Sequence, residues 1–206
     1  MSLIDLVKAL RETNVEAMIA QRALEFSDIN KKESTGWFLE LCFCIMTANF
    51  TAERAMRIQE SIGKGFLTMD ENELAITLKS LGHRFPNSRA RYIAKAREYA
   101  QEIKETLEPL DRAEKREWLV DKICGMGYKE ASHFLRNTGH FDYAIIDFHI
   151  LDLLEKEKII RKPDNLSKNV YLAIEKKLQE LAEELSMPVG ILDLYLWFIE
   201  TGKVLK

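Results

Sequence analysis

The sequence of 206 residues predicts an all-α protein. Three observations support this prediction. Apolar residues recur at helical spacing in almost every segment, no segment alternates apolar and polar residues as a half-buried strand does, and no Asn-Gly turn joins two apolar runs. With 47% apolar and 31% charged residues, the composition is that of a soluble globular chain. Its length allows one or two lobes and is too short for several independent domains.

The N-terminal part of the chain predicts three helices. An apolar stripe from Leu3 to Leu10 marks the first, and residues 15 to 26 repeat its spacing. A polar connector over residues 26 to 34 then leads to the most apolar helix, residues 35 to 47. This run is too short to span a bilayer and contains Glu40, so we interpret it as a buried central helix.

The next segments are bounded by capping signals. Thr51 is expected to cap a helix that stops at the glycines of residues 63 to 65. Thr68 with Glu71 forms a candidate capping box for a helix that ends at Gly82. After a loop, a long helix is predicted over residues 88 to 106, and Asp111 with Glu114 forms another candidate capping box.

A candidate helical hairpin follows, in which residues 118 to 124 and 128 to 138 are joined by Gly125-Met126-Gly127. Two glycines allow positive φ and a close backbone approach. The unpaired amides at the start of the second helix, together with its dipole, can bind an anion such as a DNA phosphate. Lys129 lies in this first turn, where the dipole disfavours a positive charge, so its amine is a candidate nucleophile.

Asp147 is predicted to be the N-cap of the helix after the hairpin, because it stands between two apolar runs. Pro163 marks a later loop, a helix is expected over residues 167 to 185, and a last helix begins near Pro188 and stops at Gly202. Taken alone, the hairpin glycines, a first-turn lysine and a capping aspartate each have an ordinary structural explanation.

Charge and cysteine usage restrict the classes of partner and cofactor. A net charge of −3 argues mildly against a nucleic-acid partner, although six Lys and Arg residues and no acid occur over residues 79 to 97. Cys42, Cys44 and Cys124 lie in apolar helical contexts and are expected to be buried free thiols, not a metal site. The N-terminus has no basic segment before an apolar core, so a cytoplasmic protein is expected.

The combination is more specific than its parts. Gly125-Met126-Gly127-Tyr128-Lys129, followed eighteen residues after the lysine by Asp147 in Ile-Asp-Phe-His-Ile, resembles the helix-hairpin-helix DNA glycosylases, the superfamily of endonuclease III. Within it the chain is most similar to the type 2 8-oxoguanine DNA glycosylase/lyases of archaea and some bacteria. The similarity rests on four runs: residues 42 to 52, 82 to 85, 127 to 137 and 192 to 206.

This resemblance implies a two-lobed all-α fold with a DNA-binding cleft between the lobes. Residues 31–141 would form a barrel lobe that carries the helix-hairpin-helix (118–138), and residues 1–30 with 142–206 would form the second lobe. In the family the lysine that matches Lys129 attacks the sugar and the aspartate that matches Asp147 is catalytic. The implied activity is base-excision repair: release of 8-oxoguanine through a Schiff base, then strand nicking by β-elimination.

The resemblance also assigns residues to the base. Phe85 and Trp197 match the aromatic pair that sandwiches the flipped base, a contact worth about 1–3 kcal/mol per base. Lys206 matches a C-terminal lysine implicated in separating 8-oxoguanine from guanine, and its terminal carboxylate could accept the N7 hydrogen of the damaged base. Asp193 shares a helical face with Trp197 and is a candidate acceptor for the N1 and amino edge of the base.

DNA contacts are expected from Asn49, which would fill the vacated stack, from Arg84, from the amides at Gly125 and Gly127, and from His133. The expected partner is double-stranded DNA containing 8-oxoguanine, bound by a monomeric prokaryotic protein. Many endonuclease III relatives carry a C-terminal four-cysteine iron–sulfur loop, but no cysteine follows Cys124, so no such cluster and no catalytic metal is expected. The sequence leaves open whether hairpin carbonyls hold a structural cation, as they do in relatives.

Two alternatives remain at this point. One is a glycosylase/lyase for oxidised pyrimidines, closer to endonuclease III. The other is a non-catalytic hairpin module that binds DNA through residues 123 to 129.

Overall fold

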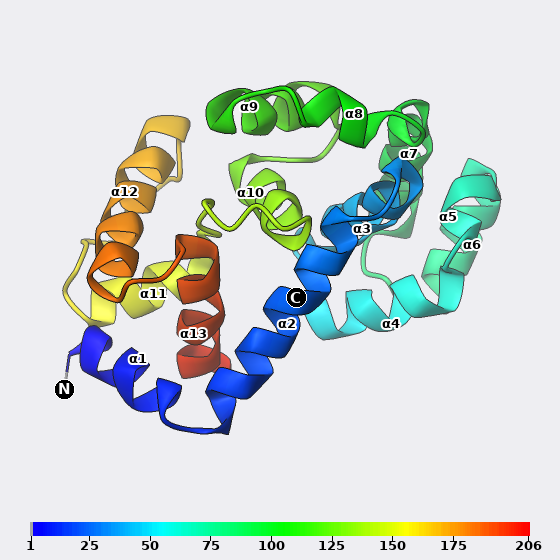
Figure 1. Cartoon of the computed structure of the whole chain (residues 1–206). Helices are drawn as coiled ribbons and strands as arrows, with labels where there is room; N and C mark the ends of the chain where they lie inside the picture. The colour runs from blue at the N-terminus through cyan, green and yellow to red at the C-terminus, as the bar shows by residue number, and fades with distance from the viewer. Residues whose placement is uncertain (1) are drawn as a thin grey trace. The chain divides into compact units, whose positions relative to one another are not determined.

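The computed structural model describes residues 2–206, and helices are its only regular elements over that range (Figure 1), which confirms the all-α prediction. The chain divides into two compact units. We call Ile29–Phe134 the hairpin unit, and we call the residues up to Asp28 together with Leu135–Lys206 the terminal unit. Each unit is described by itself.

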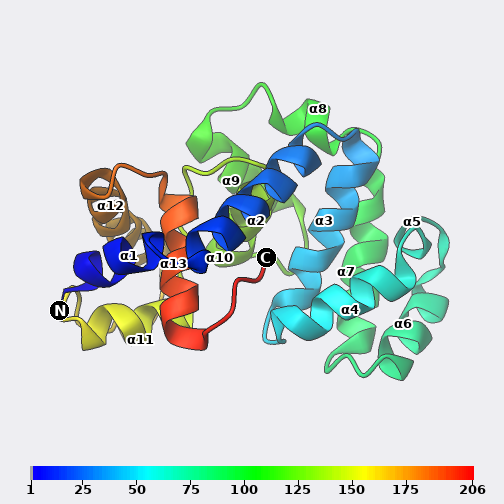
Figure 2. The same cartoon turned by 60° about the horizontal axis from the view of Figure 1, so that its bottom comes forward.

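The hairpin unit is organised around α3 (Ser34–Thr47). Phe38, Leu41 and Phe43 of this helix are fully buried. Burying each such side chain contributes about 1.5–3 kcal/mol. α3 packs against α4, α7 and α8 (Figure 2). The other elements of the unit are α4 (Ala52–Ile62), α5 (Gly65–Thr68), α6 (Glu71–Ser80), α7 (Pro86–Ala96), η1 (Arg97–Tyr99), α8 (Ile103–Leu107), α9 (Arg112–Lys122) and the first part of α10 (Tyr128–Asn137).

The terminal unit is organised around α13 (Val189–Thr201), which packs against α1, α11 and α12 (Figures 1 and 2). Leu192, Leu194 and Leu196 are almost fully buried. Its end at Gly202 is a left-handed C-cap with φ +69°, as the glycine predicts. The remaining elements are α1 (Leu3–Arg11), most of α2 (Asn14–Asn30), α11 (Phe148–Lys156) and α12 (Lys168–Glu184).

The second boundary between the units falls inside α10, earlier than the sequence-based boundary after Phe141. Local contacts explain this difference. Arg136 forms an ion pair with Asp193 of α13 at 3.2 Å, and its guanidinium lies 4.7 Å from the ring centroid of Phe26. The Phe141 carbonyl accepts the Gly190 N–H at 2.8 Å. These contacts attach the end of α10 to α2 and α13.

The helix predicted over residues 88 to 106 is interrupted, and this prediction was wrong. α7 ends at Ala96, a 3₁₀ turn follows, and α8 begins at Ile103. No glycine or proline causes the break. Arg97 Nε instead donates to the Phe66 carbonyl at 2.7 Å, and the Lys104 N–H donates to the Ser34 hydroxyl at 2.8 Å. Because both partners are distant in sequence, the local pattern could not reveal this interruption.

Two smaller predictions also need correction. The capping box of α6 is formed by Asp70 and Glu73, not by Thr68 and Glu71, because Thr68 still belongs to α5. The connector expected from residue 26 is shorter, since α2 continues to Asn30. The boxes and caps expected at Asp111–Glu114 and at Asp147 are confirmed.

The cysteine prediction holds for two of its three residues. Cys42 and Cys44 are buried free thiols, whereas Cys124 is exposed in the turn after α9. The turn projects this side chain because its neighbours Ile123 and Met126 supply the buried contacts. Over the described residues, no helix combines the length and apolarity that crossing a bilayer requires.

Candidate active site

The turn between α9 and α10 requires a glycine at one position. Gly125 has φ +82°, and a Cβ atom there would lie 2.5 Å from the Tyr92 ring. Met126 is buried, and its N–H donates to the Ile123 carbonyl at 3.2 Å. Gly127 has no positive φ, and a Cβ atom there would meet only Glu130 Oε2 at 3.5 Å. The close approach therefore depends on Gly125, whereas Gly127 is exposed and meets no ring.

Lys129 is the second residue of α10 and its side chain is 23% exposed. Its Nζ atom lies 3.4 Å from Glu130 Oε1, and Glu130 Oε2 accepts the Gly127 N–H at 3.3 Å. One carboxylate therefore contacts both the predicted nucleophile and the amide expected to bind phosphate. This role of Glu130 was missed, although a carboxylate three residues after Gly127 is the spacing at which a helix caps its own N-terminus.

Side chains lock α9 against α10. Arg116 is buried, donates to the Ser132 hydroxyl at 3.2 Å, and lies with its guanidinium 5.3 Å from the ring centroid of Tyr128. The Tyr128 hydroxyl donates to Glu117 of α9. Because these contacts join the two helices directly, the hairpin holds Lys129 on a rigid element.

Asp147 is positioned in a different way. The preceding residues, 143–146, are buried but form neither helix nor strand. Asp147 then caps α11, with an extended backbone (φ −108°) and with Oδ1 accepting the Ile150 N–H at 3.0 Å. Its side chain is neither buried nor fully exposed. An N-cap carboxylate of this kind can stabilise a positive charge that develops on a bound sugar.

Two loops of the hairpin unit are tied together by His83. Its ring Nδ1 accepts the Phe85 N–H at 3.0 Å, so Nε2 carries the proton and donates to the Met46 carbonyl at 3.0 Å. The ring also stacks on Phe50, with centroids 4.2 Å apart. Burial lowers the pKa of His83 below its ordinary value, which favours this neutral form. The sequence motif contained His83, but its local context did not indicate a bridging role.

These loops carry two of the predicted DNA-contacting residues, Asn49 and Arg84, and the predicted base-stacking residue Phe85. Asn49 is exposed and has φ +56°, a left-handed conformation that asparagine tolerates better than most residues. Phe85 is 36% exposed and lies beside Arg84, whose guanidinium is 5.0 Å from its ring centroid. All three therefore occupy surface positions of the hairpin unit.

The basic segment over residues 79 to 97 offers less free positive charge than the sequence suggested. Arg89 is buried and donates to the Ala48 carbonyl, and Arg97 donates to the Phe66 carbonyl. Both guanidinium groups therefore stabilise the hairpin unit from inside. His133 is also buried, with its ring 5.6 Å from that of Phe43 in a T-shaped contact. The predicted phosphate contact of His133 does not fit this position.

The C-terminal residues that are predicted to contact the base lie in the terminal unit. Trp197 makes a T-shaped contact with His149 at 5.0 Å, and its buried Nε1 has no hydrogen-bond partner among the described residues. Asp193 Oδ2 is engaged in the buried ion pair with Arg136, so a contact of this oxygen with a base requires that pair to open. Lys206 is half-buried at the end of the tail.

Comparison with known proteins gives the same family at every level. Residues 19–187 match the Ogg-HhH family, described as 8-oxoguanine DNA glycosylase. Two curated relatives are named 8-oxoguanine DNA glycosylase/AP lyase: a Methanocaldococcus jannaschii protein 49% identical over 100% of both chains, and a Korarchaeum cryptofilum protein 47% identical over 99% of this chain and 98% of its own. A crystal structure of the Methanocaldococcus jannaschii glycosylase/lyase in complex with 15mer DNA containing 8-oxoguanine matches with a TM-score of 0.97, 48% identity and full coverage of both chains.

The chain belongs to the 8-oxoguanine DNA glycosylase family. The resemblance read from the glycine hairpin, Lys129 and Asp147 is thereby confirmed at the level of family and fold. Over residues 2–206, no group of three His, Cys, Asp or Glu side chains is arranged to hold a metal ion.

Within this chain, Lys129 lies in the hairpin unit and Asp147 in the terminal unit. Phe85 and Trp197 are divided between the units in the same way. The approach of these pairs to one another, and the cleft between the lobes, therefore stay predictions. What the structure establishes is how each residue is held in its own unit.

Proposed function

We propose that this protein is a bifunctional 8-oxoguanine DNA glycosylase/AP lyase that acts on double-stranded DNA in the prokaryotic cytoplasm. The observation that carries the proposal is the position of Lys129 in the first turn of α10, directly after the tight Gly125 turn. The full-length similarity to named 8-oxoguanine DNA glycosylase/AP lyases supports the substrate.

The chemistry follows from an amine nucleophile. Lys129 Nζ forms a bond to C1′ of the flipped nucleotide, the glycosidic bond breaks, and the base leaves with the bonding electrons and takes up a proton. Asp147 stabilises the positive charge that develops on the sugar. Opening of the sugar ring gives a Schiff base, loss of a C2′ proton then expels the 3′ phosphate, and hydrolysis releases Lys129.

Base recognition is assigned to Phe85 and Trp197 by stacking, and to Lys206 at the tail. Flipping costs a few kcal/mol, which stacking offsets in part. Deleting Lys206 is expected to narrow the preference for 8-oxoguanine over guanine. Rates on matched duplexes test this assignment, and an unchanged ratio would remove Lys206 from it. Asp193 is the weakest of the assigned residues because Arg136 already engages it.

Borohydride trapping tests the central claim, because reduction converts a Schiff base into a stable covalent adduct. We expect the wild-type protein to be trapped on an 8-oxoguanine duplex and Lys129→Gln to give no adduct. The matched control is Lys122→Gln, which removes one charge from the exposed last turn of α9 in the same hairpin and should still be trapped. Equal trapping of wild type and Lys129→Gln would end the proposal.

The same assay separates the alternatives. A duplex with thymine glycol in place of 8-oxoguanine should give little adduct, whereas preferential trapping on thymine glycol would favour the oxidised-pyrimidine reading. A protein that binds duplex DNA but forms no adduct on either substrate would be the non-catalytic module.

A cation at the hairpin is a further expectation. Backbone carbonyl oxygens of the turn are ligands of the kind that hard cations prefer. If such an ion bridges the turn to a phosphate, replacing potassium by tetramethylammonium at constant ionic strength should weaken DNA binding. Equal affinity in both salts would contradict a monovalent ion, and equal affinity with and without a chelator would contradict a divalent one.

A further inference from the structure

The segment that precedes Asp147 is buried without belonging to any helix or sheet. Tyr143, Ala144, Ile145 and Ile146 are each at most 6% exposed, and none lies in a regular element. Buried backbone N–H and C=O groups need hydrogen-bond partners, because leaving one unpaired is costly. The partners of this segment are therefore informative.

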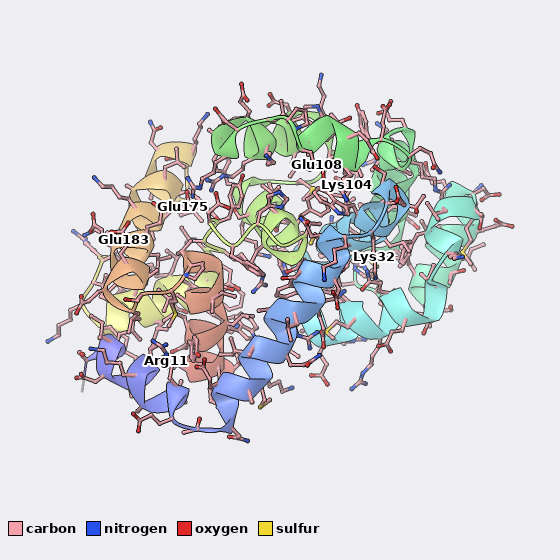
Figure 3. The ribbon with its side chains drawn as sticks, in the orientation of Figure 1. Arg11, Lys32, Lys104, Glu108, Glu175 and Glu183 are labelled. Atoms are coloured by element: carbon pink, nitrogen blue, oxygen red, sulfur yellow. The ribbon has the colours of Figure 1, made fainter. Side chains whose placement is uncertain are left out.

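Side chains of α12 supply the partners of three of these backbone groups. Glu175 (labelled in Figure 3) accepts the Ala144 N–H through Oε1 at 3.1 Å. The Tyr171 hydroxyl donates to the Ala144 carbonyl at 2.7 Å and accepts the Ile146 N–H at 3.3 Å. Both side chains are almost completely buried, with exposed fractions of 1% for Tyr171 and 2% for Glu175.

The pattern of these three bonds is the one found at a strand edge. In an extended chain, the N–H and C=O of one residue and the N–H of the residue two positions later point to the same side. Tyr171 and Glu175 are four residues apart and thus share one face of α12. One helix face therefore pairs with a backbone edge that would otherwise require a neighbouring strand.

The last bond of this edge lies directly before Asp147. The Ile146 N–H is held by Tyr171, and one residue later the Asp147 carboxylate is held through Oδ1 by the Ile150 N–H. The backbone of Asp147 is thus fixed on its N-terminal side by α12 and on its C-terminal side by α11. A shift of the buried segment would move the Asp147 carboxylate with it.

We propose that Tyr171 and Glu175 are positioning residues for Asp147 and that they set the rate of base release through it. This inference rests on the proposed function. Neither residue touches DNA in this role; they act by holding the buried segment at the register that presents the Asp147 carboxylate. Misplacing a catalytic group by about 1 Å can cost on the order of 100-fold in rate.

The test is single-turnover excision of 8-oxoguanine from a duplex at a temperature well below the unfolding midpoint of every variant. Tyr171→Phe removes the hydroxyl and keeps the ring. We expect the maximal rate to fall by about 10- to 100-fold while the half-saturating protein concentration stays within about twofold. The matched control is Tyr195→Phe, a tyrosine of the same unit that is 2% exposed and donates to Glu16, and its rate should stay within about twofold of wild type.

A double-mutant cycle separates positioning from general destabilisation. In an Asp147→Asn background, Tyr171→Phe should cause no further loss of rate, because the group through which it acts has already been removed. An undiminished loss in that background would overturn the inference. So would equal losses for Tyr171→Phe and Tyr195→Phe in the wild-type background.

Glu175 provides a second route if Tyr171→Phe folds poorly. Glu175→Gln keeps a carbonyl oxygen that can accept the Ala144 N–H, whereas Glu175→Ala does not. We expect the glutamine variant to retain most of the rate and the alanine variant to lose about 10-fold or more. Equal rates for the two variants would contradict the role of Glu175. Borohydride trapping of the wild type is run in parallel: its failure would reject the proposed function, whereas wild-type trapping with unaffected variants would reject only this inference.

Discussion

The two proposed catalytic residues are held in opposite ways. Lys129 depends on local structure, because its turn, its helix and its carboxylate neighbour all lie within a few residues of it. Asp147 depends on distant structure, because the segment before it is held by α12, more than twenty residues later in the chain. A candidate nucleophile can therefore be recognised from a short motif, whereas the way its proposed partner is held depends on residues far along the chain.

The largest effect should come from Asp147→Asn. Asparagine caps a helix about as well as aspartate, so the free energy of unfolding should change by less than about 0.5 kcal/mol. The rate of base release should fall by about 10²- to 10⁴-fold, because the charge is lost while the local structure stays. Thermal unfolding and single-turnover rates measure the two effects. A rate within tenfold of wild type would show that Asp147 is only a cap.

The local side of the comparison is sharpened by two glycine variants. Gly125→Ala forces a left-handed alanine and a contact with the Tyr92 ring, and we expect a loss of about 2–4 kcal/mol in the free energy of unfolding. Gly127→Ala meets no such contact and should cost at most about 1 kcal/mol. Chemical denaturation of both variants, and of Gly125→Ala with Tyr92→Ala to relieve the clash, measures the difference. Equal losses for the two single variants would contradict the assigned roles.

Glu130 contacts both Lys129 and the Gly127 amide, so removing its charge should have a moderate effect on DNA binding. Glu130→Gln can still accept the Gly127 N–H, but it removes a negative charge beside Lys129. We expect duplex DNA to bind about 3- to 10-fold more tightly at low salt, with the gain shrinking as salt rises. Asp121→Asn, at the exposed end of α9, is the charge-matched control and should change binding less. Unchanged affinity for Glu130→Gln would place the bound phosphate away from this carboxylate.

The smallest expected effect concerns His83. Its pKa is lowered in the folded protein, so below the ordinary histidine value the unfolded chain binds more protons than the folded one. The contribution of His83 to the free energy of unfolding is therefore fully present above about pH 6.5. It is lost as the pH falls toward the lowered pKa that His83 has in the folded protein. In urea titrations at a series of pH values, His83→Gln should flatten the decrease in the free energy of unfolding that occurs below about pH 6.5. If the free energy of unfolding of His83→Gln depends on pH as steeply as that of the wild type, the decrease at low pH comes from other groups.

Much of the fold was predictable because its signals are local. The Asp111–Glu114 capping box, the Asp147 cap and the Gly202 helix stop all act within four residues. The break after Ala96 and the unit boundary inside α10 were not, since they arise from Ser34, Arg97 and Arg136 reaching distant partners.

The same distinction applies to the candidate site. The hairpin and Lys129 follow from a short glycine motif, whereas the burial of His133 and the commitment of Arg89 to the Ala48 carbonyl depend on how helices pack. Burial of a polar side chain is a property of tertiary structure, and a sequence pattern of charged residues overestimates how many remain at the surface.

The exposed thiol in the hairpin turn has a practical consequence. Cys124 is the accessible one of the three cysteines, since Cys42 and Cys44 are buried in α3. A maleimide fluorophore added to the native protein would therefore attach beside Gly125 without any engineered residue. Its emission would report the arrival of a duplex at the turn in real time, independently of whether any bond is cut.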